Sequence, residues 1–419
     1  MKITILNGSS IPGAMDAYFS KLIPLLEKKG HSVDHLFLRE MNLHPCTGCF
    51  NCWVKTPGHC IHADDSDLLD KTIIQSDFLL WASPLVLGFP SAILKTAMDK
   101  HIPLIHPYLE ISGREMHHVR RYEHYPRLGM LIEKEAETDE SDLQILKNIF
   151  ARAALNFKSR LEFFETIEGS VEETVNLIAH PQSTAHLFTS APLPTDFTQI
   201  DPPQHLTVFN GSPRGTASNT MLLMNEFLKG YAADYELHHL YQVNALKEQV
   251  QAFADAQCVW LAFPLYTDGM PGIVKQFIEA LAPFKDRPNN PAMGFLIQSA
   301  FNQGLHSRYI ERYVQKLAAR FGSPYLGSIV KCGSGSLQVL PTRGLFKRLQ
   351  YLGNELSSRG CLEQHTLRRI ASPERYSLDP NFLIENAMYI HVSRLLFDRK
   401  LKKNGVYAKR FDQPFLQES

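Results

Sequence analysis

The sequence lacks long hydrophobic runs and any excess of charge. Its 419 residues include 43 lysines and arginines against 43 aspartates and glutamates, so composition gives no reason to expect a nucleic-acid or anionic-membrane partner. No apolar run reaches the roughly 18 residues that a membrane helix requires. The opening residues already have the pattern of a strand and leave no room for a signal peptide, so we expect a cytoplasmic protein.

Cysteines are few, and the commonest nucleotide motifs are missing. There are seven cysteines, an odd number, and four of them fall between Cys46 and Cys60, which argues against a secreted disulfide scaffold. Neither a G-x-G-x-x-G fingerprint nor a G-x-x-x-x-G-K-[ST] loop occurs. The 44% hydrophobic share, with 10% aromatics, instead indicates large globular cores, and the length favours two or three domains.

Short apolar strands alternate with amphipathic helices in two successive rounds. This alternation predicts an α/β protein with two tandem, flavodoxin-like, doubly wound parallel sheets of five strands each, in strand order 2-1-3-4-5. A helical C-terminal tail follows the second sheet. The expected strands are 3–6, 33–38, 78–82, 128–133 and 161–166 in the first round, and 206–210, 236–240, 259–263, 293–298 and 326–331 in the second.

The two rounds align in detail, which indicates an internal duplication. Residues Ala82–Lys95 match Ala262–Lys275 without a gap, and Asn7-Gly8-Ser9 matches Asn210-Gly211-Ser212. We therefore expect a first domain at 1–167, a linker at 168–204, a second domain at 205–360 and a helical extension at 361–419. The extension should contain one long amphipathic helix, Asn381–Lys402.

One strand-loop-helix stretch, Thr207–Thr220, has the chemistry of an anion site. An apolar strand breaks at Gly211, and a short polar loop leads into a helix whose free N–H groups attract negative charge. Arg214 adds a positive charge that suits a phosphate.

Together with Pro264-Leu265-Tyr266 and Pro271–Lys275, this stretch resembles the NADPH-dependent FMN reductase family. The resemblance implies that loops after successive strands of the second domain hold FMN. The residues expected at the phosphate are Ser212, Arg214, Ser218, Asn219 and Thr220. Those expected along the isoalloxazine edge are Pro264, Leu265, Tyr266, Thr267, Asp268, Gly269 and Met270, and those at the pyrimidine edge are Ser299, Asn302 and Gly304.

The resemblance implies an FMN-dependent NAD(P)H oxidoreductase that reduces a small-molecule electron acceptor or a redox partner protein. No residue is an evident acid or base, which agrees with flavin chemistry because the cofactor carries the electrons. The alternative is a flavin-binding electron carrier that never uses NAD(P)H itself. The tandem domains could form an internal pseudo-dimer, or the chain a homodimer.

The first domain has lost this phosphate chemistry. Its equivalent loop, Gly8–Asp16, lacks the arginine, and Asp16 near the helix start would repel a phosphate. Val86 stands in place of Tyr266, and the third loop is the acidic stretch Glu133–Glu140. We expect no FMN in this domain.

In its place the first domain carries a compact cysteine motif. Cys46, Cys49, Cys52 and Cys60 have the spacing C-x2-C-x2-C-x7-C, which resembles the motif of the iron-sulfur flavoproteins. Four thiolates this close could bind a [4Fe–4S] cluster or zinc. Reduced thiols or a disulfide, with no metal, are the alternative.

Overall fold

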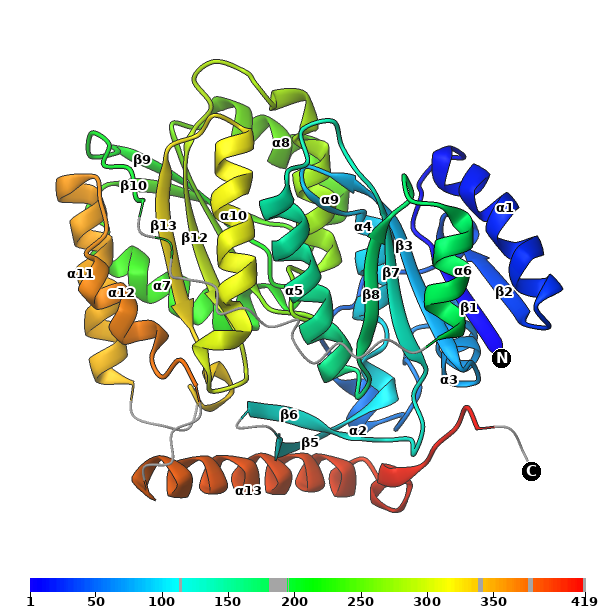
Figure 1. Cartoon of the computed structure of the whole chain (residues 1–419). Helices are drawn as coiled ribbons and strands as arrows, with labels where there is room; N and C mark the ends of the chain where they lie inside the picture. The colour runs from blue at the N-terminus through cyan, green and yellow to red at the C-terminus, as the bar shows by residue number, and fades with distance from the viewer. Residues whose placement is uncertain (113–114, 181–193, 195, 338–341, 376–379, 417–419) are drawn as a thin grey trace. The chain divides into compact units, whose positions relative to one another are not determined.

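A computed structural model describes residues 1–112, 115–180, 194, 196–337, 342–375 and 380–416 (Figure 1). The chain divides into two compact units. The first comprises Met1–Glu110, His117–Thr189 and Glu385–Ser419, and the second comprises Ile111–Met116 and Ser190–Ile384. Among the described residues, no helix combines the length and apolar character needed to cross a membrane.

The first unit alternates strands and helices from its first residues. Its elements, listed together with the two strands β5 and β6 that pair in a sheet of their own, are β1 (Lys2–Asn7), α1 (Ala14–Lys28), β2 (Ser32–Phe37), η1 (Leu38–Glu40), α2 (Asn51–Val54), α3 (Ser66–Ile74), β3 (Phe78–Val86), β4 (Phe89–Pro90), α4 (Ala92–Asp99), η2 (Ile102–Leu104), β5 (Ile105–Ser112), β6 (Glu115–Arg120), β7 (Arg127–Glu133), α5 (Glu140–Asn156), β8 (Leu161–Thr166) and α6 (Val171–Ala179).

The first sheet has the order β2-β1-β3-β7-β8, with β4 added antiparallel to β3. Because side chains alternate across a strand, each sheet face has its own core. Ile3 and Ile5 face a cluster that includes Phe19 of α1 and Ile178 of α6. Trp81 lies on the opposite face, where its ring centroid is 5.7 Å from that of Phe150 in α5. Both faces are therefore covered, as a parallel sheet requires.

The second unit repeats this plan. Its elements are β9 (His205–Asn210), η3 (Gly215–Ala217), α7 (Asn219–Gly230), β10 (Asp234–His239), η4 (Val243–Ala245), α8 (Leu246–Asp255), β11 (Cys258–Pro264), α9 (Gly272–Ala280), η5 (Ala282–Phe284), β12 (Ala292–Gln298), η6 (Gly304–Ser307), α10 (Arg308–Arg320), β13 (Tyr325–Lys331), η7 (Ser334–Ser336), α11 (Arg343–Arg359) and α12 (Gln364–Ala371). The sheet order is β10-β9-β11-β12-β13, so the predicted fold of two flavodoxin-like sheets is confirmed.

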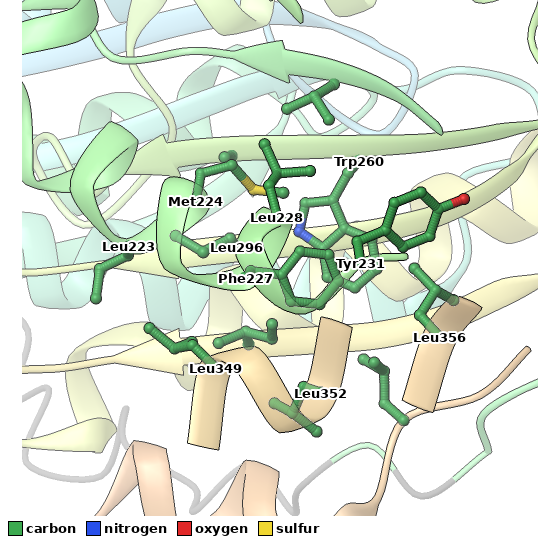
Figure 2. Close-up of a cluster of buried hydrophobic side chains, with 14 of the residues drawn as sticks. Leu223, Met224, Phe227, Leu228, Tyr231, Trp260, Leu296, Leu349, Leu352 and Leu356 are labelled. Carbon is green, nitrogen blue, oxygen red and sulfur yellow. The ribbon is translucent and has the colours of Figure 1, made fainter. Parts of the chain in front are cut away.

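Helices α7 and α11 pack closely on one face of the second sheet. Their contact is tight because a Cβ added to Gly353 would lie 2.1 Å from the carbonyl oxygen of Phe227. Figure 2 shows Phe227 stacked on Trp260 beside leucines of α11, and the two ring centroids are 4.7 Å apart. On the other face, Phe209 contacts Phe277 of α9. This two-sided core fixes the carboxyl ends of the strands.

The duplication extends to individual hydrogen bonds at those strand ends. Gly8 donates its N–H to the carbonyl of Ala82 at 2.8 Å, and Gly211 donates to that of Ala262 at 2.7 Å. The side-chain oxygen of Asn7 accepts the N–H of Ser9 at 3.0 Å, and Asn210 does the same for Ser212 at 3.1 Å. The two units therefore share these backbone and asparagine hydrogen bonds, and they differ at this edge in other residues.

The C-terminal extension contains the predicted long helix, α13 (Pro380–Lys403), followed by η8 (Tyr407–Phe411). From Glu385 onward it belongs to the first unit. Phe397 lies edge-on to Trp53, and the side chain of Asn404 donates to the carbonyl of Val54 at 2.7 Å. The end of the chain thus braces the segment that follows the first three cysteines.

Candidate functional site

Loops of the second unit that follow β9, β11 and β12 meet at the carboxyl edge of the sheet. Asn210 is in register with Ala262, and Pro264 is in register with Gln298. The three loops predicted to hold a cofactor therefore begin from neighbouring positions. Leu265 adds a direct link because its N–H donates to the carbonyl of Gln298 at 2.8 Å.

The first loop is a rigid entry to helix α7. Ser218 is its N-cap, and the hydroxyl accepts the N–H of Met221 at 3.1 Å and donates to the carbonyl of Gly215 at 2.7 Å. The Ser218 side chain therefore shapes the loop. Ser212 is buried, whereas Arg214 is exposed at the loop tip.

Two side-chain hydrogen bonds join this helix start to the other loops. Thr220 accepts from the amide nitrogen of Gln298 at 3.1 Å, and Asn219 donates to the carbonyl of Ser334 at 2.7 Å. Neither Gln298 nor Ser334 was predicted as a site residue. Each forms a hydrogen bond with a residue far away in the sequence, and local motifs do not reveal such pairs.

The second loop is a tight turn between Tyr266 and Gly269. Each donates its N–H to the other's carbonyl, at 2.9 and 3.0 Å, while Thr267 and Asp268 have φ angles of 47° and 55°. Two consecutive positive φ values are those of a type I′ turn. Met270 is fully buried after the turn, so it packs in the interior and Tyr266, half-buried, is the more accessible side chain.

The third loop is closed by a segment that the sequence did not place there. Ser299 is buried and donates its N–H to the carbonyl of Lys331 at 3.0 Å, and Asn302 lies against Gly333. Gly304 donates its N–H to the carbonyl of Pro373 at 2.8 Å. The chain that follows α12 therefore covers one end of this loop.

In the first unit, the cysteines of the predicted motif gather around one pocket. Cys46, Cys49, Cys52 and Cys60 all line it, together with Lys100. All four are free thiols, with Cys52 buried and Cys49 exposed. The structure thus brings the four predicted ligands together, although across the described ranges no three histidine, cysteine or acidic side chains converge closely enough to hold a metal ion.

A buried cation stands beside these thiols. The Nζ atom of Lys100 lies 2.8 Å from a carboxylate oxygen of Asp64 and 3.2 Å from the sulfur of Cys60. Burial raises the pKa of Cys46 to about 12 and that of Cys52 well above its ordinary value, and the neighbouring thiols add to the effect at Cys52. Without a metal these two side chains are neutral thiols.

Parts of the chain are similar to known proteins. Residues 1–117 match the model of the family described as NADPH-dependent FMN reductase. An iron-sulfur flavoprotein of Archaeoglobus fulgidus is 33% identical over 81 residues, 19% of this chain and 36% of that protein. An iron-sulfur flavoprotein of Methanocaldococcus jannaschii is 31% identical over 105 residues, 25% of this chain and 53% of that protein. The chain thus spans between a third and just over half of these relatives.

Solved structures of flavin enzymes are also similar. An NAD(P)H:quinone oxidoreductase from Methanothermobacter marburgensis aligns with a TM-score of 0.31 and 14% identity, covering 36% of this chain and 95% of that one. An FMN-dependent NADH-azoreductase from Bacillus anthracis aligns with a TM-score of 0.31 and 13% identity, covering 37% of this chain and all of that one (100%).

The family resemblance inferred from the motifs is confirmed, but its location is informative. The match covers residues 1–117 of the first unit, whereas the loops predicted to hold FMN lie in the second. The likeness to the NADPH-dependent FMN reductase family is therefore shown for residues 1–117 of the first unit.

Proposed function

We propose that the protein is an FMN-dependent NAD(P)H oxidoreductase of the cytoplasm and that its FMN binds at the carboxyl edge of the second sheet. The observation that carries the proposal is the joining of helix α7 to the neighbouring loops through Thr220 and Asn219. This linkage holds a helix N-terminus, which attracts anions, next to the tight turn at Tyr266. A phosphate site and a ring site thereby adjoin each other.

The residues present suit FMN. Arg214 and the N-terminus of α7 would hold the phosphate, with Ser212 and Thr220 as hydroxyl partners. The turn 266–269 would lie along the isoalloxazine edge, with Tyr266 as a flat wall. The third loop, residues 298–304, is polar and has no charged side chain, so it would accept the pyrimidine edge without opposing a reduced, electron-rich ring.

FMN, when bound, supplies the hydride chemistry, taking electrons from NAD(P)H and delivering them to a small-molecule acceptor or a redox partner protein. The residues of the chain would position the cofactor and exclude water from it. Ser212, Ser299 and Met270 are buried within their loops, and the segment at Pro373 closes one end of the third loop. No side chain is needed here as an acid or base.

The cysteine pocket of the first unit suits an accessory cluster in its chemistry. Four thiols share one pocket, and a [4Fe–4S] cluster would take Cys46, Cys49, Cys52 and Cys60 as ligands. The buried ammonium of Lys100 would offset part of the negative charge of four thiolates. Closing the set on a cluster requires the thiols to move together.

The test is an absorption spectrum of the anaerobically purified full chain, with iron and flavin analysis, followed by addition of NADH or NADPH. The proposal expects flavin bands that bleach on addition of one of the nucleotides. Bleaching by dithionite alone would instead indicate an electron carrier, and absence of flavin would reject the proposal. Iron near four atoms per chain supports the cluster, and flavin without iron removes it.

A further inference from the structure

We propose that helix α13 joins two copies of this chain by packing antiparallel against the same helix of a second copy. The contact is symmetric and uses the face of α13 opposite to its contacts with Trp53 and Tyr108. The inference goes beyond the proposed function, because it concerns how chains associate and does not depend on which unit binds FMN. Two features of α13 carry it, an exposed apolar face and the order of the charges along the helix.

One face of α13 is bound within the first unit. Phe397 packs against the small cluster that contains Trp53, and Leu401 is 1% exposed. The carboxylate of Asp398 accepts a hydrogen bond from the hydroxyl of Tyr108 at 2.6 Å. Residues three or four positions apart lie on the same side of a helix, so these three side chains mark one face. This face fixes α13 and leaves the opposite one for another surface.

The opposite face of α13 is apolar and exposed. Met388, Val392 and Leu395 follow each other at spacings of four and three residues, and Leu396 lies beside them. These four side chains are between 40% and 61% exposed. The outer face of a surface helix is ordinarily polar, and a contiguous exposed apolar patch marks an interaction site. The outer face of α13 therefore has the character of an interface.

A twofold axis through Val392 makes this face complementary to itself. In an antiparallel pair, residues equally far before and after Val392 lie side by side, so Met388 of one copy faces Leu396 of the other. The same register places Glu385 beside Arg399 of the other copy, and the pair occurs twice. A parallel pair would instead bring like charges together at both ends. The charges thus select the antiparallel arrangement.

The cations of α13 favour a second copy over an anionic membrane. A helix that lies on a membrane places its cations on the polar face, free to reach lipid phosphates. In α13 the guanidinium of Arg394 lies 5.5 Å from the ring centroid of Tyr108, and the ammonium of Lys400 lies 5.8 Å from that of Phe397. Both cations are therefore turned toward the first unit, and Glu385 stands at the edge of the apolar face.

The first experiment is sedimentation velocity of the full chain from about 1 to about 100 µM, because a single helix pair is smaller than the roughly 1,200 Å² of a stable interface and should dissociate on dilution. Wild type should pass from monomer to dimer over this range. Val392→Lys places two cations face to face at the twofold axis and should raise the dimer Kd at least about tenfold. Ala387→Lys adds the same charge at an exposed position on the flank of the helix and should not.

A charge exchange tests the register. Glu385→Arg and Arg399→Glu should each raise the dimer Kd about tenfold, because two attractive pairs become repulsive in the symmetric contact. The double variant Glu385→Arg with Arg399→Glu restores opposite charges and should recover the affinity of wild type. Lys409→Glu, the same change of sign at an exposed position outside α13, is the matched control and should leave the Kd unchanged.

Three results overturn the proposal. They are a wild-type protein that stays monomeric at about 100 µM, a dimer that is unaffected by Val392→Lys, and a double charge variant as weak as the single ones. Circular dichroism shows whether each variant keeps its fold. Binding of the monomer to phosphatidylserine vesicles, lost in Val392→Lys, would assign the face to a membrane instead. Failure of the proposed function is seen separately, as absence of flavin absorbance whatever the state of association.

Discussion

The Nζ atom of Lys100 lies 3.2 Å from the sulfur of Cys60, and it also contacts Asp64 at 2.8 Å. The side chains of both Lys100 and Asp64 are almost fully buried. A buried charge is tolerated when its partner is present and is costly once that partner is removed. The Lys100–Asp64 pair therefore ties the cysteine segment to the end of α4.

Lys100→Met should destabilise the protein by about 3 kcal/mol, because Asp64 is then left as a buried carboxylate without its cation. Lys100→Arg keeps the charge and should recover part of the loss. Urea unfolding, followed by circular dichroism, measures both. A loss for Lys100→Met below about 1 kcal/mol would show that the pair is not coupled to folding.

The same pair predicts a dependence of stability on pH. Burial alone would raise the pKa of Asp64, but hydrogen bonds from Lys100, Ser66 and the backbone of His44 outweigh it and lower the pKa from 3.8 to about 2. Folding therefore favours the ionised form, and the stabilisation is complete above about pH 5 and lost as pH falls from about 4 toward 2.

The measurement compares wild type with Asp64→Asn in urea across that range. The difference in unfolding free energy should reach up to about 2 kcal/mol at neutral pH and vanish near pH 2. A difference in unfolding free energy that is constant with pH would contradict the lowered pKa of Asp64.

Gly211→Ala should lower the stability of the second unit. An added Cβ would lie 2.3 Å from a methyl carbon of Val274 in α9, so the loop after β9 has to shift, at a cost of about 1–3 kcal/mol. Gly13→Ala is the matched control, since an added Cβ there meets no atom within 4 Å and the φ angle is −173°. Thermal unfolding of both variants tests this, and equal losses would contradict it.

The C-terminal segment should protect the cysteines. Arg121 donates to the carbonyl of Asp412 at 2.9 Å, Gln413 donates to the carbonyl of Arg121 at 2.6 Å, and a Cβ on Gly58 would strike Pro414. Removing residues 404–419 should therefore speed the reaction of Cys52 with a thiol reagent, measured by peptide mass spectrometry. Lys409→Ala, an exposed change in the same segment, should leave the rate unaltered.

The fold was predictable from sequence because it repeats local patterns. Apolar strands such as Val259–Phe263 and helix signals such as Ser218 report on their own neighbourhoods, and the strand order then follows from βαβ geometry. The gap-free match of Ala82–Lys95 with Ala262–Lys275 located the duplicated turns. The residues expected at the phosphate and at the ring edge were chosen by the same reasoning and stay a prediction.

What remained hidden depends on contacts between distant residues. The bond from Asn219 to Ser334, the cover of Gly304 by Pro373, and the contact of Lys100 with Cys60 each join segments whose proximity no periodicity reveals. The pairing of β5 with β6 was likewise not predicted. The acidity of Glu133–Glu140 was noticed as a repulsive charge, but the binding of Glu135 to the turn amides emerges only in three dimensions.

Two arginines distinguish the second unit from the first as the site of FMN. The measurement is FMN affinity, by flavin fluorescence, of Arg214→Ala and Arg39→Ala. Loss of a charge-assisted phosphate contact should weaken binding by about 10- to 100-fold in Arg214→Ala and leave it unchanged in Arg39→Ala, whose guanidinium pairs with Asp16. Weakening by Arg39→Ala alone would place the flavin in the first unit and contradict FMN binding by the second.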